Sequence, residues 1–69
     1  MSEFVAVLRG RVRDAQQALR AAWEAGYPYE AGLHSGRLAD LVELAGQHGI
    51  DIDGWVAPDV LAQLGEEDR

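Results

Sequence analysis

Residues 22–31 read Ala-Trp-Glu-Ala-Gly-Tyr-Pro-Tyr-Glu-Ala and divide the chain into two regular halves. Gly26 suits the position just after a helix, because glycine adopts the left-handed backbone conformation at no steric cost. Pro28 keeps Tyr27 out of helical geometry and is itself tolerated in the first turn of a new helix. This stretch therefore predicts that one helix ends and another begins within a few residues.

On both sides of this turn, one set of residues recurs at alternating steps of three and four. The set consists of Val5, Leu8, Val12, Ala15, Leu19 and Ala22 before the turn, and Ala31, His34, Leu38, Leu41, Ala45 and His48 after it. This spacing places each set on one face of a helix. We predict an all-α fold, an antiparallel hairpin of helices at about residues 3–25 and 29–48. Because Gly32 and Gly36 weaken the second helix, a loop at 30–35 with Ser35 as N-cap is the alternative.

Folding the hairpin at residues 26–28 pairs the two stripes layer by layer. The expected layers are Ala22 with Ala31, Leu19 with His34, Ala15 with Leu38, Val12 with Leu41, Leu8 with Ala45 and Val5 with His48. Leu19, Leu38 and Leu41 are expected to be the most costly to truncate, at roughly 2–5 kcal/mol each. His34 is the candidate buried polar residue, either a hydrogen-bonded core histidine or a pH-sensitive or ligand-binding group.

The C-terminal part predicts a turn and one short helix. Residues 51–54 have the composition of a turn, and the short helix spans about residues 58–64 with Pro58 in its first turn. We expect Trp55 and this helix to close the open end of the hairpin against Phe4 or Leu8. Residues 1–65 then form a single helical domain, and 66–69 are expected to be a disordered acidic tail.

A chain of 69 residues without cysteine has a small core and no disulfide to reinforce it. Oligomerisation is the remaining remedy, so we expect a homodimer in which two hairpins form a four-helix bundle. The strip expected at this interface consists of Leu33, Leu44, Trp23 and Tyr29. No membrane span or signal peptide is recognised, so a cytoplasmic protein is expected. The absence of lysine, asparagine and threonine is typical of a GC-rich bacterial genome.

The net charge of −6 disfavours nucleic acid as a partner, because a phosphate backbone repels it. The charge is uneven: residues 1–37 carry five arginines and four acidic residues, whereas residues 38–69 carry one arginine and eight acidic residues. Such asymmetry could set an orientation in which basic and acidic halves of two chains meet, but a solvated surface with an acidic tail is the favoured interpretation, because exposed charges contribute little.

The sequence indicates no enzyme, no cofactor and no metal site. Neighbouring helical residues such as His34 and Ser35 point about 100° apart, so they form no catalytic dyad. His34 and His48 lie about 21 Å apart along one helix, too far to share an ion. The acidic turn at 51–54 brings its glycine two positions earlier than a calcium-binding loop requires.

We therefore predict a small non-catalytic interaction or regulatory module that presents a helical surface to a protein partner. The candidate surface combines arginines on one side of the first helix with aromatic residues near the turn, because both residue types anchor interfaces. Its members are Arg9, Arg13, Arg20, Trp23, Tyr27 and Tyr29. In the alternative interpretation, the aromatic residues have no binding role and only cover the tip of the hairpin. The functional alternatives are a nucleic-acid accessory protein that uses Arg9, Arg11, Arg13 and Arg20, and a ligand-binding dimer with a site near His34.

Overall fold

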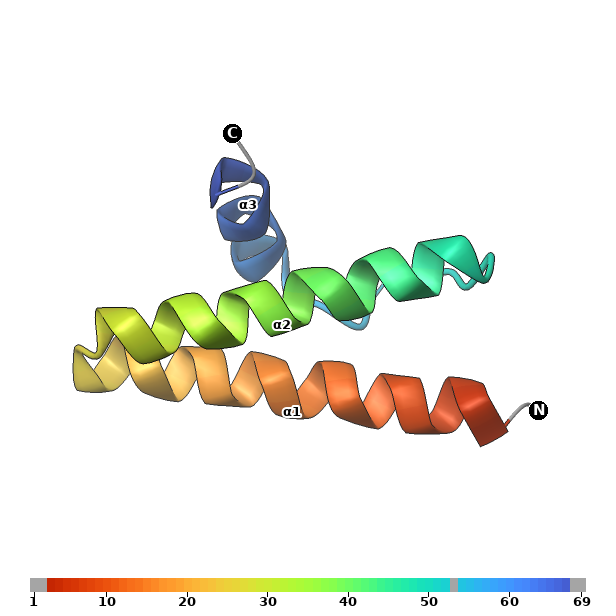
Figure 1. Cartoon of the computed structure of the whole chain (residues 1–69), viewed down its shortest axis with the longest axis horizontal. Coiled ribbons are helices and arrows are strands. Elements are labelled where there is room, and N and C mark those ends of the chain that lie inside the picture. Colours follow the sequence, from red (N-terminus) through yellow and green to blue (C-terminus); the bar gives the residue numbers. More distant parts are fainter. Residues whose placement is uncertain (1–2, 53, 68–69) are drawn as a thin grey trace.

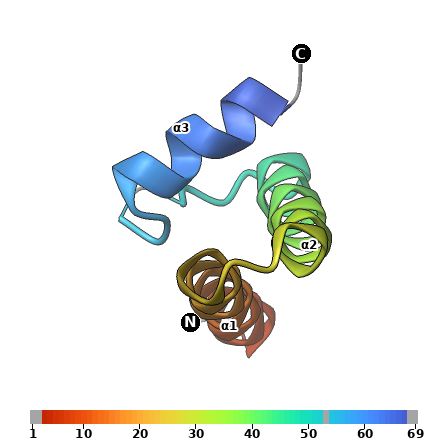
Figure 2. The same ribbon diagram turned by 90° about the vertical axis from the view of Figure 1, so that its left-hand side faces the viewer.

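The computed structural model describes residues 3–52 and 54–67, with side chains as far as Leu64 (Figure 1). Within these residues the chain forms three helices and no strand: α1 (Glu3–Ala25), α2 (Pro28–Gln47) and α3 (Pro58–Glu67). α1 and α2 lie side by side as an antiparallel hairpin, and α3 crosses one side of it (Figures 1 and 2). The prediction of an all-helical fold with two long packed helices is confirmed.

The turn between α1 and α2 has the local structure that its sequence predicts. Gly26 has a φ of +75°, its N–H donates to the Trp23 carbonyl at 3.1 Å, and the Tyr27 N–H donates to the Ala22 carbonyl at 2.9 Å. These two bonds satisfy carbonyls that would otherwise lack a partner at the end of α1. Pro28 then opens α2. Residues 30–35 are helical, which rules out the alternative loop.

Two glycines give opposite expectations for stability. Gly10 lies inside α1, and a Cβ added there would meet no heavy atom within 4 Å. Gly10→Ala is therefore expected to raise the free energy of unfolding by roughly 0.5–1 kcal/mol. Gly26→Ala forces a Cβ into the left-handed region and is expected to lower it by about 1–2 kcal/mol. Urea unfolding measures both variants, and an equal gain from the two would contradict the turn geometry.

α1 buries five of the six residues that the sequence predicts, namely Leu8, Val12, Ala15, Leu19 and Ala22, and leaves Val5 half-buried. On α2 the prediction is confirmed for Ala31, Leu38 and Ala45, which are buried, but not for His34, Leu41 and His48. Ser35, only 1% exposed, is the buried polar residue, whereas His34 and Leu41 are half-buried. The reason is the C-terminal segment, whose Val56 and Val60 join the core that α1 and α2 form.

The C-terminal segment docks along the middle of α1 and does not close the open end of the hairpin. Arg9 lies over the Trp55 ring with its Cζ 5.9 Å from the ring centroid. At the open end, the rings of Phe4 and His48 contact each other instead, with their centroids 4.9 Å apart. α3 also continues to Glu67, three residues beyond its predicted end. Asp53 in the predicted turn and residues 68–69 of the predicted tail lie outside the described residues.

Gln16 on α1 forms hydrogen bonds to this segment with both the oxygen and the nitrogen of its side-chain amide. Its Oε1 accepts from the Ala57 N–H at 2.7 Å, and its Nε2 donates to the Trp55 carbonyl at 3.4 Å. Gln16→Leu leaves the Ala57 N–H without this acceptor, so the free energy of unfolding is expected to fall by roughly 1–3 kcal/mol. Gln17→Leu, at the exposed neighbouring position, is the matched control and is expected to change it by less than about 0.5 kcal/mol. Equal losses in urea unfolding would contradict this role.

Candidate functional site

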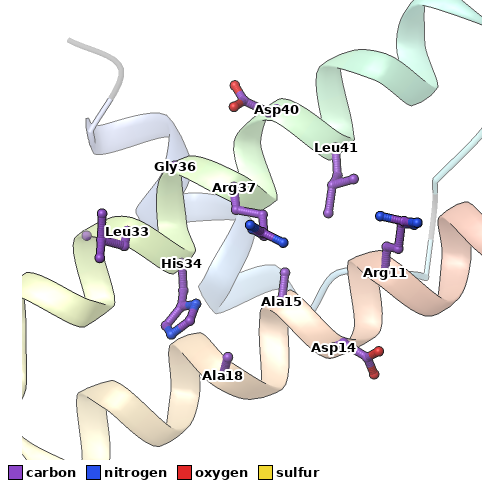
Figure 3. Close-up of a pocket in the computed structure, with 11 residues that line it drawn as sticks. Arg11, Asp14, Ala15, Ala18, Leu33, His34, Gly36, Arg37, Asp40 and Leu41 are labelled. Atoms are coloured by element: carbon purple, nitrogen blue, oxygen red, sulfur yellow. The ribbon is translucent and has the colours of Figure 1, made fainter.

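α3 and the segment before it cover one side of the hairpin and leave the opposite side open (Figures 2 and 3). On that side a groove of about 1180 Å³ runs between α1 and α2. We call this side the open face, and its lining residues are Arg11, Asp14, Ala15, Ala18, Gly32, Leu33, His34, Gly36, Arg37, Asp40 and Leu41. All of them come from the two long helices, so the hairpin alone builds the groove.

Alanine and glycine residues line much of the groove, and an exposed leucine lies at its edge. Ala15 and Ala18 project from α1 toward the hollow (Figure 3). Leu33 is 56% exposed, which is more than any other described leucine, and Leu41 is half-buried. The groove therefore has an apolar floor and an unpartnered leucine at its edge.

Each long helix contributes one arginine and one aspartate to this face, three positions apart. Arg11 and Arg37 extend over the groove, whereas Asp14 and Asp40 lie on its outer flanks (Figure 3). Within the described residues the ion pairs are Arg13 with Asp14 at 3.5 Å and Arg20 with Asp59 at 3.0 Å. Arg11 and Arg37 thus have no carboxylate partner in the described part of the chain, and both are available to a ligand or protein.

His34 points from α2 toward Ala18, at the tip end of the groove (Figure 3). It lies beside the seam between the helices and not inside it, so it is accessible from the open face. The alternative of a ligand site near His34 would therefore use the same groove as a protein partner. No group of three described His, Asp or Glu side chains is placed to hold a metal ion.

Two of the three arginines predicted to bind a partner instead contact the chain's own C-terminal segment. Arg9 packs on Trp55, and Arg20 donates to the Asp59 carboxylate. The Arg20 guanidinium holds the pKa of Asp59 below its ordinary value. This ion pair therefore contributes to stability above about pH 4, and the contribution is lost as the pH falls through the lowered pKa. Arg13 lies beside Asp14, on the exposed outside of α1.

The predicted aromatic residues are exposed at the hairpin tip. Trp23 and Tyr27 line a second, smaller hollow of about 190 Å³, and Tyr29 is 73% exposed. This hollow shares no lining residue with the groove of the open face. Trp23 and Leu33, which were predicted to share one interface strip, thus lie at separate sites.

Sequence reasoning did not single out Arg37, Asp14 and Asp40 for the site. The signal that points to them is the pattern Arg-x-x-Asp, which occurs at residues 11–14 and again at 37–40, on opposite sides of the turn. No protein-family model, curated protein or solved structure matches the chain. None of the helices in the described part of the chain has the length and apolar character needed to cross a bilayer.

Proposed function

We propose that the protein is a non-catalytic interaction module that binds another protein through the open face of its hairpin. The observation that carries the proposal is the combination of the exposed Leu33 side chain with two arginines that have no carboxylate partner in the described residues. Arginine is enriched in interface cores, and an apolar side chain beside it gains free energy when a partner removes it from water.

The groove supports binding better than it supports catalysis. Its lining contains one histidine, His34, and no serine, tyrosine or lysine. General acid–base or nucleophilic catalysis requires a second reacting side chain within hydrogen-bond reach. The neighbouring hydroxyl, that of Ser35, is buried in the core and not presented to the groove. The arrangement suits recognition of a surface.

The nucleic-acid alternative has less support. Arg9 and Arg20, two of the four arginines that it needs, pack against the chain's own C-terminal segment. The net charge of −6 opposes approach to a phosphate backbone. Arg11, the third, belongs to the open face.

Self-association into a four-helix bundle is part of the proposal. A second hairpin needs an uncovered side of the first one, and α3 leaves the open face available (Figure 2). Leu33 remains in the proposed interface, whereas Trp23 and Tyr29 lie at the hairpin tip, outside the open face.

Two exposed leucines provide a matched test of the open face. Leu33 on α2 is 56% exposed and Leu61 on α3 is 46% exposed. The tagged wild-type protein, Leu33→Glu and Leu61→Glu are used to capture proteins from the native cell extract, after circular dichroism has shown equal helicity. The wild type and Leu61→Glu are expected to retain the same bound proteins, and Leu33→Glu is expected to lose them. Equal capture by all three, or loss only with Leu61→Glu, would contradict the proposal.

A further inference from the structure

We infer that the open face binds a second copy of this chain, related to the first by a two-fold axis parallel to the hairpin. The inference rests on the proposed function and names the occupant of the same surface. It follows from how the two Arg-x-x-Asp patterns are placed relative to each other across the groove.

At each of two levels along the hairpin, one helix carries an arginine over the groove and the other carries an aspartate on its outer flank. Arg11 on α1 lies opposite Leu41 of α2, so it is close in level to the next residue back, Asp40, whose side chain lies on the outer flank of α2 (Figure 3). Arg37 on α2 lies opposite Ala15 of α1, so it is close in level to Asp14, whose side chain lies on the outer flank of α1 (Figure 3). The two levels are about 4.5 Å apart, because each helix advances three residues between its arginine and its aspartate. The helix that carries the positive charge at one level thus carries the negative charge at the other.

This alternating pattern is complementary to itself. A two-fold axis parallel to the hairpin places α1 on α2 of the partner, in antiparallel orientation. Arg11 then faces the partner subunit's Asp40, and Asp14 faces the partner subunit's Arg37. The symmetry repeats both pairs, so four arginines meet four aspartates across the interface.

Partners of uniform charge fit this face less well. A uniformly acidic helix would be attracted by Arg11 and Arg37 but repelled by Asp14 and Asp40, and a uniformly basic helix would meet the reverse arrangement. Like charges placed opposite each other across an interface cost several kcal/mol. The occupant must carry alternating charges at a spacing of one helical turn, and the chain itself carries this pattern.

The size and the apolar content of the face suit a dimer. The molecule measures 38 × 23 × 17 Å, and its broad side is comparable to the roughly 800 Å² that each partner contributes to a standard interface. Leu33 of one copy has a hollow to enter in the other, because Ala15, Ala18 and Gly36 leave space in the groove. α3 lies on the far side of each hairpin and does not obstruct the contact (Figure 2).

Two charge-altered variants test this arrangement by complementation. The acidic-face variant carries Arg11→Asp and Arg37→Asp, and the basic-face variant carries Asp14→Arg and Asp40→Arg. Sedimentation velocity at tens of micromolar is expected to show a wild-type dimer, and each variant alone as a monomer. An equimolar mixture of the two variants is expected to form a heterodimer. Both variants keep a net negative charge, so this pairing does not arise from opposite overall charges.

A third variant makes the test independent of the charge changes. Leu33→Glu is expected to raise the dimer dissociation constant at least tenfold, with unchanged helicity by circular dichroism. A wild-type protein that stays monomeric at several hundred micromolar would overturn the inference. So would a wild-type dimer that Leu33→Glu leaves intact, or variants that remain monomeric when mixed. If the wild type is monomeric but Leu33→Glu still abolishes capture from the extract, the proposed function stands and the second copy as occupant does not.

Discussion

Truncation of Leu38 to alanine is expected to lower the free energy of unfolding by roughly 2–5 kcal/mol. The Leu38 side chain is 0% exposed and packs in one cluster with Leu19, Val12 and Val60. Its removal takes apolar surface out of the core and leaves a cavity that the helices only partly fill. A single small core supplies about 3–5 kcal/mol of net stability, so this variant is expected to be largely unfolded at physiological temperature.

Leu41→Ala on the same helix is the matched control for this result. Leu41 is half-buried and borders the groove, so its truncation is expected to cost clearly less than that of Leu38. Urea unfolding followed by circular dichroism measures both variants. An equal loss of unfolding free energy in the two variants would contradict the orientation of α2 about its axis. It would fit the orientation predicted from the sequence, in which the stripe that includes His34 buries both leucines.

Val60→Asp is expected to release α3 from the hairpin. Val60 is 0% exposed, and an ionised carboxylate at its place has no partner among the apolar residues of the core. Burial of such a charge costs more than α3 gains by docking. We expect a loss of at least about 2 kcal/mol in the free energy of unfolding. Amide hydrogen exchange should accelerate across residues 58–64, while α1 and α2 keep their helical signal.

Leu61→Asp controls for the added charge on the same helix. Leu61 is the next residue, and its side chain faces solvent to a large extent. The substitution is expected to change the free energy of unfolding by less than about 0.5 kcal/mol. Fluorescence of Trp55 in a Trp23→Phe background reports whether the segment before α3 has come away. Unchanged fluorescence and exchange in Val60→Asp would contradict the packing of α3.

The helix boundaries could be predicted from the sequence because local chemistry determines them. Gly26 and Pro28 set the end of α1 and the start of α2, and Pro58 sets the start of α3. Each of these signals depends on a backbone preference of one or two residues. The end of α3 was less predictable, because Gly65 in the sequence suggested a stop that the helix passes through.

The orientation of α2 about its axis could not be read from periodicity. Ala31, His34, Leu38, Leu41 and Ala45 alternate at steps of three and four, and so do Ala31, Ser35, Leu38, Val42 and Ala45. Each stripe contains one polar residue, His34 or Ser35, so the pattern alone does not decide between them. The choice between them depends on where Val56 and Val60 dock, which is a long-range contact.

The location of the site depends on the same long-range contact. Arg9 and Arg20 share a helix face that looked available, but the C-terminal segment packs against it. The sequence does contain the two Arg-x-x-Asp patterns of the open face. It does not show that they meet across a groove, because that requires knowing which side of the hairpin α3 covers.

Amide chemical shifts of the wild-type protein, recorded from a few micromolar to several hundred micromolar, test the central claim most directly. If the open face binds a second copy, the shifts of residues 11–18 and 33–41 should change together with concentration, while those of α3 stay constant. No change at any concentration, or changes confined to α3, would contradict the assignment of the open face as the docking surface.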